Sequence, residues 1–373
     1  MQIAIVSQVI KKEDGQGRVN YELAQELISA GHKLTLVAAD IGSDLLDHPA
    51  ITVRRIPRTR VPTYLLRDQI FALLSTFALY KEHRRLDVIV VNGFVTWWPS
   101  DVNLVHFVHD AWLKSKSHPA REKLTLSNAY RWFYTALNAR LEKIGFKQSR
   151  AVVAVSHLVR RQLQACGIKD ETITVIPNGV DLQMFSPGPA DRDQFGLPDG
   201  AFVALFAGDI RTSRKNLDSV LRALARTTNI HLAVAGNATR SPYPAMAQAL
   251  GVADRTHFLG LRRDIAALMR SSDAFVFPSR FEPFGLVILE ASAVGLPVVT
   301  ARTAGACEAL CGDGMIVLDS PDDDEGLAAA LERLAGDPEL RRSMSTSARR
   351  AAQELSWRAA TSQYSRLIEG LAQ

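Results

Sequence analysis

Cysteine is scarce in this sequence of 373 residues, which contains only Cys166, Cys307 and Cys311. The count is odd, and the spacing does not fit a metal-binding pattern of paired cysteines. The sequence therefore indicates neither a disulfide-stapled secreted domain nor a cysteine metal site. Three unpaired thiols suit a reducing cytosol.

Long hydrophobic runs are also missing. No apolar run approaches the roughly 18 residues that are needed to span a bilayer. Residues 1–7 lead directly into a predicted strand and do not have the layout of a signal peptide. With 47% hydrophobic residues and a mean hydropathy of zero, the chain has the composition of a globular protein. Its length makes two domains the natural expectation, and we expect it in the cytoplasm.

Acidic residues are few in two segments, although the net charge is only +5. Residues 54–85 contain eight Lys or Arg against two Asp or Glu, and residues 113–161 contain eleven against two. The second segment also carries the aromatic residues Tyr130, Trp132 and Phe133. Cations beside aromatic residues favour contact with an anionic membrane surface or an anionic lipid-linked acceptor. The alternative is that these helices pack on a sheet with solvated charged faces. No recognition motif accompanies the charge, so we expect no nucleic-acid partner.

The first half alternates predicted strands and helices, starting with a strand at 2–9, a helix at 19–30 and a strand at 33–38. Between the first strand and the helix, Gly15 and Gly17 would allow a phosphate to approach the backbone closely at a helix start. A dinucleotide fingerprint fits poorly, because Asn20 stands in place of the third glycine and the loop is long. A plain flexible loop is the alternative.

A later predicted strand of the first half, at 102–108, ends beside a candidate site residue. His109 follows this strand, where open α/β sheets bind their ligands. We expect His106, inside the strand, to be a packed core residue. A tight turn at 177–181 and a proline-rich linker at 185–189 follow, and we place the domain boundary near residue 185.

The second half repeats the alternation and predicts a second doubly wound sheet. Its strands are expected at 202–207, 231–235, 256–259, 274–277, 297–300 and 315–318. The segment after the first of these opens a helix with three cations, and Arg211 and Lys215 could neutralise a diphosphate. An exposed basic loop is the alternative. Two helices, at 339–355 and 357–371, close the chain.

Residues 279–290 join a buried strand to a helix and carry two carboxylates. Glu282 falls in the loop, and Glu290 falls about a turn and a half into the helix. The free backbone amides of Phe284, Gly285 and Leu286 would form an anion site at the helix start. Carboxylates beside a diphosphate-sized anion site suit a nucleotide sugar. Otherwise, Glu282 is a solvated loop residue and Glu290 is half of a surface ion pair.

The spacing Glu282-x7-Glu290, in the setting Phe-Pro-Ser-Arg-Phe-Glu-Pro-Phe-Gly-Leu-Val-Ile-Leu-Glu-Ala, resembles a known family. The segments Ala-Val-Val-Ala-Val-Ser, Val-Ile-Pro-Asn-Gly-Val-Asp and Gly-Leu-Pro-Val-Val-Thr match the same family in order. Over almost its full length, the chain resembles the retaining glycosyltransferases of family 4, which have the GT-B fold. This implies two Rossmann-like domains that face each other across a donor-binding cleft. Residues 1–185 would bind the acceptor, residues 186–356 the nucleotide sugar, and helix 357–373 would pack back on the first domain.

The resemblance also implies roles for the candidate residues. Glu282 would contact hydroxyls of the donor sugar, and Glu290 would hold the ribose. Lys215 aligns with the diphosphate lysine of the family, and His109 with the histidine near the donor sugar. The remaining contacts would come from backbone amides around Phe284, Gly285 and Leu286 and from the glycine loop at Gly15 and Gly17.

One position departs from the family. Asp209 stands where the family has an arginine, and Arg211 is our candidate for its role. We expect Asp209 to point away from the phosphates, because a carboxylate facing them would be unfavourable.

The function implied by the resemblance is transfer of a sugar from a UDP- or GDP-linked donor to an acceptor hydroxyl, with retention and without a metal or cofactor. The acceptor would be lipid-linked or a saccharide, in bacterial polysaccharide, lipopolysaccharide or glycolipid synthesis. The protein could then sit peripherally on the cytoplasmic face of the inner membrane. The alternatives are a non-catalytic nucleotide-sugar-binding protein of the same fold and a nucleotide-sugar epimerase.

Overall fold

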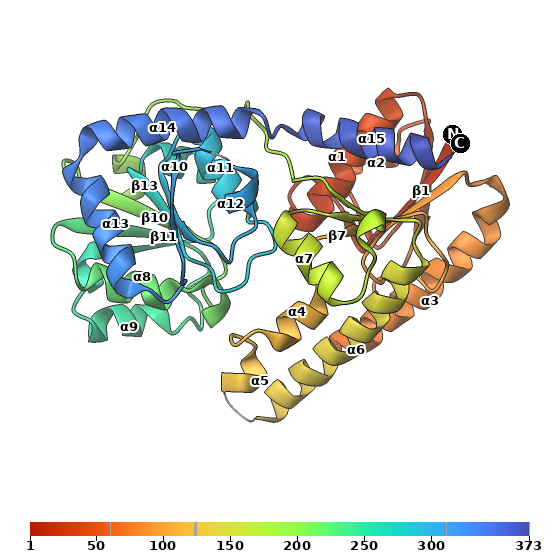
Figure 1. The fold of residues 1–373 in the computed structure, drawn as a ribbon, viewed down its shortest axis with the longest axis horizontal. Helices are drawn as coiled ribbons and strands as arrows, with labels where there is room; N and C mark the ends of the chain where they lie inside the picture. The colour runs from red at the N-terminus through yellow and green to blue at the C-terminus, as the bar shows by residue number, and fades with distance from the viewer. Residues whose placement is uncertain (60, 123–124, 311, 373) are drawn as a thin grey trace. The chain divides into compact units, whose positions relative to one another are not determined.

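The chain folds into two compact units of parallel sheet and helices (Figure 1). The computed structural model describes residues 1–59, 61–122, 125–310 and 312–372, so Cys311 lies outside the described residues. Unit 1 comprises Met1–Asn178 and Trp357–Gln373, and unit 2 comprises Gly179–Ser356. The first division precedes the boundary predicted near residue 185.

Unit 1 is built on a seven-stranded parallel sheet with the strand order β5-β3-β1-β6-β7-β8-β9, and β2 and β4 form a separate two-stranded ladder. Its strands are β1 (Gln2–Val6), β2 (Val9–Ile10), β3 (Lys33–Ala38), β4 (Asp40–Ile41), β5 (Ile51–Arg55), β6 (Val88–Asn92), β7 (Val102–Val105), β8 (Ala151–Ala154) and β9 (Ile173–Val175). Its helices are α1 (Gly15–Ser29), α2 (Ser43–Leu46), α3 (Tyr64–Glu82), η1 (His83–Arg85), α4 (His109–Lys114), α5 (Pro119–Glu122), α6 (Leu126–Gln148), α7 (His157–Ala165), η2 (Asp170–Thr172) and α15 (Trp357–Leu371). The central strands are apolar runs that are buried on both faces, as parallel sheets require.

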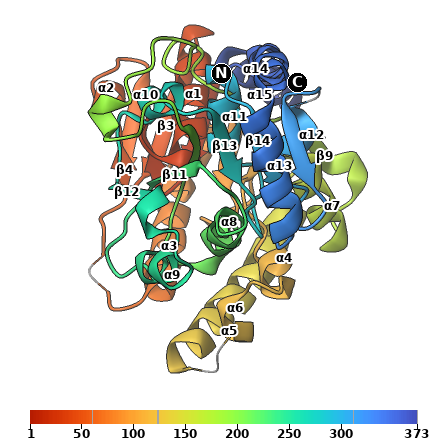
Figure 2. The ribbon, with the colours of Figure 1, turned by 90° about the vertical axis from the view of Figure 1, so that its left-hand side faces the viewer.

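The terminal helix α15 belongs to unit 1 and packs against α1. The Arg18 guanidinium lies 5.5 Å from the ring centroid of Trp357, and the Thr361 hydroxyl donates to Glu26. Figure 2 shows α1 and α15 together, while α3 and α6 lie at the other side of the unit 1 sheet. The predicted bounds of this helix, 357–371, are confirmed.

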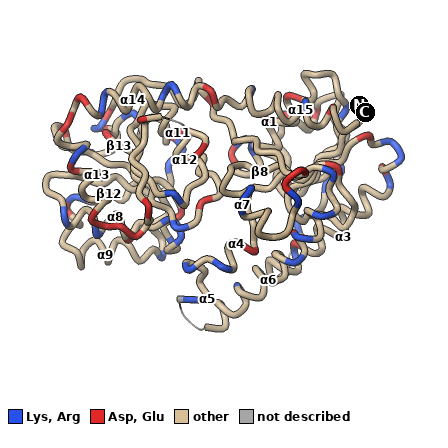
Figure 3. Tube along the Cα trace, in the orientation of Figure 1, with Lys and Arg blue, Asp and Glu red and all other residues tan. Residues whose placement is uncertain are grey.

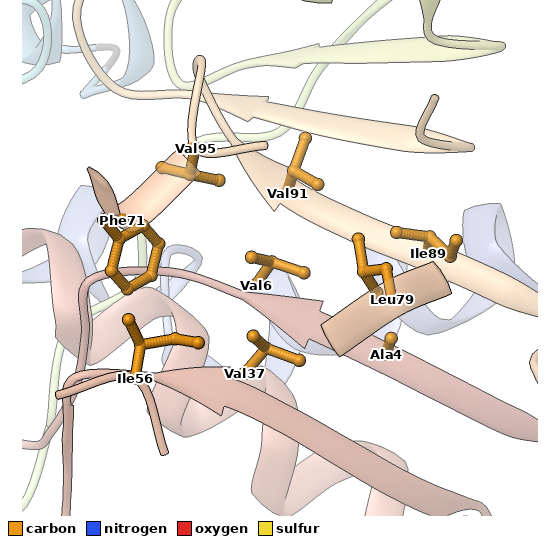
Figure 4. Close-up of a cluster of buried hydrophobic side chains, with 9 residues drawn as sticks. All are labelled: Ala4, Val6, Val37, Ile56, Phe71, Leu79, Ile89, Val91 and Val95. Atoms are coloured by element: carbon orange, nitrogen blue, oxygen red, sulfur yellow. The ribbon is translucent and has the colours of Figure 1, made fainter. Parts of the chain in front are cut away.

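The two basic segments of the sequence form mainly helices α3 to α6 and the turn after α3 (Figure 3). Helix α3 packs its inner side on the sheet through a cluster of buried apolar side chains (Figure 4). The strands contribute side chains from one face of the sheet, because Val6 and Val91 are direct partners in the ladder. The cluster comprises Ala4, Val6, Val37, Ile56, Phe71, Leu79, Ile89, Val91 and Val95.

Unit 2 is built on a six-stranded parallel sheet with the strand order β12-β11-β10-β13-β14-β15. Its strands are β10 (Phe202–Ala207), β11 (Ile230–Ala235), β12 (Thr256–Gly260), β13 (Ala274–Phe277), β14 (Val298–Ala301) and β15 (Met315–Leu318). Its helices are η3 (Asp193–Phe195), η4 (Ser213–Lys215), α8 (Leu217–Leu224), α9 (Tyr243–Ala249), η5 (Ala253–Arg255), α10 (Ile265–Arg270), α11 (Leu286–Val294), α12 (Ala306–Ala309), α13 (Asp324–Gly336) and α14 (Pro338–Gln353). The six predicted strands of this half are present, each within one residue of its predicted bounds.

Each sheet has one point where successive connections leave in opposite directions. In unit 1 this point lies between β1 and β6, and in unit 2 it lies between β10 and β13. The loops that follow two such strands diverge and leave a crevice at the carboxyl end of the sheet, where α/β proteins bind ligands. The sheet topology therefore directs attention to the segments after these four strands.

Candidate functional site

The two loops at the switch point of unit 2 bring Lys215 and Glu282 together. Lys215 ends the short helix η4 after β10, and Glu282 lies in the loop after β13. The ammonium group of Lys215 donates a hydrogen bond to the Glu282 carboxylate and lies 5.1 Å from the ring centroid of Phe277. Two residues that the sequence singled out separately, 67 positions apart, thus form one ion pair.

Backbone and side-chain contacts hold these two loops against each other. The backbone N–H of Arg280 donates to the Arg214 carbonyl at 2.9 Å, and the Ser279 hydroxyl donates to the same carbonyl. The Arg280 guanidinium forms ion pairs with Asp218 at 2.6 Å and Asp322 at 2.7 Å. These carboxylates raise the pKa of Arg280 despite its burial, so the charge that joins the loops is permanent. The positions of Lys215 and Glu282 are therefore fixed before any ligand binds.

Burial dominates the electrostatics of Lys215. Loss of solvent lowers the pKa of its ammonium group below the ordinary lysine value, and the Glu282 carboxylate opposes this effect. The nearby Arg214 lowers the pKa further. A cation that is poorly hydrated at this position would gain from a second anionic partner, such as a phosphate group.

Helix α11 begins beside this ion pair, and Gly285 is its N-cap residue. The backbone of Gly285 has φ +100°, a value that residues other than glycine rarely adopt. An added Cβ would also come within 3.2 Å of Cγ of Glu282. As the N-cap residue, Gly285 has no side chain that could accept hydrogen bonds from the amides of the first turn. Phe284 is buried and accepts from the Ala306 amide, whereas Leu286 is partly exposed at the first turn. Glu290 is partly buried in the second turn, so both predicted carboxylates belong to the same loop-and-helix segment.

Arg211 is tied to Asp209, the residue in place of the family arginine. The guanidinium Nε lies 2.8 Å from Oδ1 of Asp209, and the backbone N–H of Arg211 donates to the same oxygen. The hydrogen bond from the Arg211 side chain is the main reason why the pKa of Asp209 is lowered. Both cations are paired with a carboxylate, but Arg211 is exposed whereas Lys215 is largely buried, so solvent screens the charge of Arg211 more strongly.

The switch point of unit 1 opens into a cavity of about 430 Å³. Its walls come from the segments after β1, β6 and β7 and from the inner sides of α3 and α6. Polar side chains dominate the lining, which includes Gln8, Arg67, Asp68, Asn92, His106, His109, Tyr134, Asn138 and Glu142.

His109 starts helix α4 at the edge of this cavity and is paired with Glu142 from α6. Its Nδ1 is 2.7 Å from Oε1 of Glu142, and its backbone N–H donates to Oε2 at 3.0 Å. Burial alone would lower the pKa of His109, but the charge of Glu142 and its hydrogen bond outweigh burial and raise it. Because Glu142 occupies Nδ1, the Nε2 atom is the ring nitrogen left for other interactions.

Two further residues of the cavity wall carry buried polar atoms without partners. Both amide atoms of Asn92 and Nε2 of His106 make no hydrogen bond within the described residues. The expectation that His106 lies inside a strand was wrong, since β7 ends at Val105 and the predicted strand 102–108 is shorter. Burial lowers the pKa of His106 to about 4, so its ring is neutral. Orphaned polar atoms at a cavity wall indicate a polar ligand or bound water.

Helix α1 begins at Gly15 rather than at residue 19, which corrects the predicted helix 19–30. Asp14 caps it by accepting a hydrogen bond from the Gly17 amide at 2.6 Å. Gly15 and Gly17 therefore lie in the first helical turn. An added Cβ on Gly17 would come within 3.0 Å of Val9 and of the Asp14 carboxylate, so the cap itself requires a glycine there. Gly17 lines the cavity of unit 1.

Sequence comparison covers both units. Residues 188–351 match the family described as Glycosyl transferases group 1, and residues 14–184 match Glycosyltransferase Family 4. A D-inositol 3-phosphate glycosyltransferase of Saccharomonospora viridis is 31% identical over 351 residues, which cover 84% of this chain and 78% of that relative. The chain belongs to glycosyltransferase family 4.

Solved structures show the same GT-B fold for this family 4 glycosyltransferase. WaaG, a glycosyltransferase involved in lipopolysaccharide biosynthesis, has a TM-score of 0.76 at 21% identity over 99% of this chain and 100% of its own. Anabaena Alr3699/HepE in complex with UDP-glucose has a TM-score of 0.72 at 21% identity, again over 99% of this chain and 100% of its own. The predicted family and the predicted fold class are thereby confirmed.

Sequence reasoning about this glycosyltransferase missed the partners of its key residues. Glu142 lies within the basic segment 113–161, and its sequence context was not interpreted further. A single carboxylate in an otherwise cationic and aromatic helix is the signal that could have identified it as a buried partner. Asp68 in α3 is a similar case, because it accepts from the Tyr134 hydroxyl at 2.8 Å and from Gln8 at 2.9 Å. Within residues 1–59, 61–122, 125–310 and 312–372, no group of three His, Cys, Asp or Glu side chains could hold a metal ion.

Proposed function

We propose that this glycosyltransferase moves a sugar from a nucleoside-diphosphate sugar, linked to UDP or GDP, to an acceptor hydroxyl with retention at the anomeric carbon. The observation that carries the proposal is the Lys215–Glu282 ion pair at the unit 2 switch point, beside the start of α11 with its glycine N-cap. A buried ammonium and free amides suit a diphosphate, and a carboxylate suits sugar hydroxyls.

The relatives support this class of donor and reaction. Alr3699/HepE has been solved in complex with UDP-glucose, and WaaG is involved in lipopolysaccharide biosynthesis. D-inositol 3-phosphate glycosyltransferase is named for an acceptor that carries both hydroxyls and a phosphate. We therefore place the reaction in bacterial polysaccharide, lipopolysaccharide or glycolipid synthesis.

In the proposed reaction, the bond between the anomeric carbon and the β-phosphate oxygen breaks, and a bond from that carbon to the acceptor oxygen forms on the same face. The acceptor proton goes to the departing phosphate, so no side-chain nucleophile is required. Negative charge grows on the diphosphate as it leaves. Lys215 and the amides at the start of α11 would stabilise this charge, and fixed groups of this kind usually supply much of the catalysis.

The other residues of unit 2 would orient the donor. Glu282, held by Lys215, would accept hydrogen bonds from the sugar hydroxyls, and Glu290 would accept from the ribose. The backbone at Phe284, Gly285 and Leu286 would contact the sugar and phosphates. Arg211 would add a weaker positive charge. The reaction as proposed requires no metal or cofactor, because protein cations neutralise the diphosphate.

Unit 1 would bind the acceptor, which we propose is a lipid-linked or soluble saccharide. Its polar cavity offers unpartnered hydrogen-bonding groups at Asn92 and His106, and His109, whose Nδ1 is bonded to Glu142, also lines it. Gly15 and Gly17 would allow the substrate phosphates to approach the start of α1. A lipid-linked acceptor would place the protein at the cytoplasmic face of the inner membrane.

A nucleotide-release assay with a panel of UDP- and GDP-sugars tests the proposal. We expect release with one donor class, and a proton NMR spectrum of the product with the same anomeric configuration as the donor. An inverted anomeric signal would contradict retention. Binding of a nucleotide sugar without any release across acceptors would instead indicate a non-catalytic binding protein.

A further inference from the structure

Exposed large hydrophobic side chains are concentrated on one part of unit 1. Among the described residues, twelve such side chains are exposed, and ten belong to α3, to α6 or to the turn that carries Trp97. Unit 2 contributes only Met184 and Leu261 to that set. Scattered single exposures are normal, but a concentration of this kind marks an interaction surface.

Helix α3 carries four of these side chains on one stripe. Leu66, Leu73, Phe77 and Tyr80 are 48%, 51%, 57% and 61% exposed and are separated by seven, four and three positions. This spacing keeps them on one helix face, over a length of about 21 Å at 1.5 Å per residue. The opposite face of α3 already packs on the sheet through the cluster that contains Phe71. Tyr80 also packs against His83 and Trp98, but about half or more of each of these four side chains remains open to solvent.

Helix α6 continues this surface with aromatic and basic residues. Trp132 and Phe133 are 52% and 53% exposed near its start. Further along the same outward face, Arg140, Lys143 and Lys147 are exposed. Figure 3 shows Lys and Arg spaced along this helix.

The outward faces of α3 and α6 lie on the same side of the unit 1 sheet. The Tyr130 hydroxyl of α6 accepts from the Leu65 amide of α3 at 3.2 Å, and the Tyr134 hydroxyl donates to Asp68. These contacts join the N-terminal halves of the two helices. We call the outward face formed by Leu66, Leu73, Phe77, Tyr80, Trp132 and Phe133 the α3–α6 surface.

The carboxylates of both helices point away from this surface. Asp68 pairs with Tyr134 and Gln8, Glu82 with Arg54, and Glu142 with His109. Their side chains are only 13%, 15% and 8% exposed. The described residues of α3 and α6 therefore present apolar groups and cations outward, including Lys81, Lys143 and Lys147, but no exposed carboxylate.

We infer that the α3–α6 surface docks on an anionic lipid bilayer, with both helices lying along the membrane plane. Trp, Tyr and Phe side chains suit the headgroup level, and neighbouring Lys and Arg suit anionic lipids. A second copy of the chain suits the surface less well. A two-fold symmetric contact would bring together two faces that both carry cations and that offer no exposed carboxylate among their described residues. The inference goes beyond the proposed reaction and does not depend on it.

Sedimentation of the full chain with vesicles tests this inference. We use phosphatidylcholine vesicles with and without phosphatidylglycerol, at low and at high salt. We expect binding to the anionic vesicles at low salt, a blue shift of tryptophan emission, and weaker binding at high salt. No sedimentation with anionic vesicles at low salt would overturn the inference.

Two double variants separate the apolar and the charged parts of the surface. The double variant Leu73→Ser/Phe77→Ser should partition into vesicles about tenfold more weakly, or worse, because apolar burial is lost. The double variant Lys143→Gln/Lys147→Gln should weaken vesicle binding by roughly 25-fold, because each cation near an anionic surface contributes about fivefold. Leu261→Ser is the matched control, since Leu261 is 78% exposed in unit 2, and it should bind as the wild type does.

Thermal unfolding by circular dichroism checks that these variants fold, as exposed positions should allow. Vesicle binding that is equal in all variants would overturn the inference. A second outcome would also overturn it. If the wild type is a dimer in sedimentation equilibrium, the Leu73→Ser/Phe77→Ser variant is a monomer and neither binds vesicles, the surface belongs to a contact with a second copy. Because binding is measured without turnover, failure of the proposed reaction would leave this result unchanged.

Discussion

The two units of this glycosyltransferase share a topology, and each places a charged pair near the carboxyl end of its sheet. Unit 1 has His109 with Glu142, and unit 2 has Lys215 with Glu282. In unit 2, both partners lie on loops at the carboxyl end of the sheet. In unit 1, the carboxylate comes from the interior of the long helix α6. The same sheet architecture thus supports an acid–base pair by two different routes.

The difference lies in what fixes each pair. The loops of unit 2 are joined by the partly buried Arg280 guanidinium and by hydrogen bonds from Ser279 and Arg280 to the Arg214 carbonyl. The pair in unit 1 depends on helix packing, and the outward side of the same helix remains exposed and apolar. Unit 2 therefore has a rigid polar site with few apolar exposures, whereas unit 1 combines a polar cavity with an apolar outer surface.

Lys215→Ala should give the largest effect on turnover. Removal of the cation that faces the departing diphosphate should raise the barrier by about 3–4 kcal/mol, or roughly 10²–10³-fold in kcat. Steady-state nucleotide release measures the change. Arg226→Ala is the control, because Arg226 lies just past α8 and is 53% exposed. Near-normal turnover in Lys215→Ala would remove the catalytic role of this residue.

Arg280→Ala should destabilise unit 2 and disturb the same site indirectly. The substitution leaves Asp218 partly buried without its main partner, which should lower the free energy of unfolding by about 2–3 kcal/mol. For a unit of this size, the Tm should fall by about 4–12 °C. Arg302→Ala is the matched control, because the ion pair of Arg302 with Asp319 is 71% and 86% exposed and should contribute about 0–1 kcal/mol. Equal Tm values for the two variants would contradict the structural role of Arg280.

Glu142→Gln tests the pair in unit 1. Loss of the charged hydrogen bond should cost about 1.5 kcal/mol of stability at a pH where His109 is protonated. The carboxylate holds the pKa of His109 above its ordinary value, so this contribution is fully present below about pH 6.5. It is lost as the pH rises through the raised pKa of the folded protein.

An NMR titration of the His109 imidazole gives the direct readout. Of the groups that face His109, Glu142 and Asp68 carry negative charge, whereas burial and Asp68 raise the pKa of Tyr134 and keep it neutral. In Glu142→Gln, the pKa of His109 should fall, because burial then outweighs the remaining charge of Asp68. Glu82→Gln is the control on the neighbouring helix and should leave this titration unchanged. A His109 pKa that is the same in both variants would contradict the proposed pairing.

The sequence predicted the strands of both sheets better than it predicted the helix starts and side-chain contacts at the carboxyl ends of those strands. The apolar runs that form β10, β13 and β15 have the predicted bounds, because short apolar runs between turn residues suffice to define strands. Helix α1 starts earlier than predicted, because its glycines were assigned to a loop and Asp14 was not recognised as the cap. The Asp14 cap favours a helix start, whereas the flexible glycines favour a loop. The residue pattern alone does not show which of the two structures forms.

Lys215 and Glu282 could each be selected from sequence, since both follow strands at the end where ligands bind. Their contact could not, because it depends on which strands are neighbours, and β10 and β13 are far apart in the chain. The same holds for His109 and Glu142, which come together only when α6 packs over the end of β7. Pairing across a sheet edge is a tertiary property that local periodicity does not carry.

The smallest expected effect concerns Arg211, the candidate substitute for the arginine that the family has at position 209. The Arg211 side chain is 53% exposed and forms its ion pair with Asp209. Exposure and this pairing both weaken the electrostatic effect of Arg211 on the diphosphate. Arg211→Ala should therefore lower kcat/KM only a few-fold, which is well under the roughly 1.4 kcal/mol that a tenfold loss represents. Asp209→Ala should free Arg211 and raise kcat/KM slightly, and the double variant should match Arg211→Ala. A loss in Arg211→Ala as large as that in Lys215→Ala would show that Arg211 leaves Asp209 to meet the diphosphate.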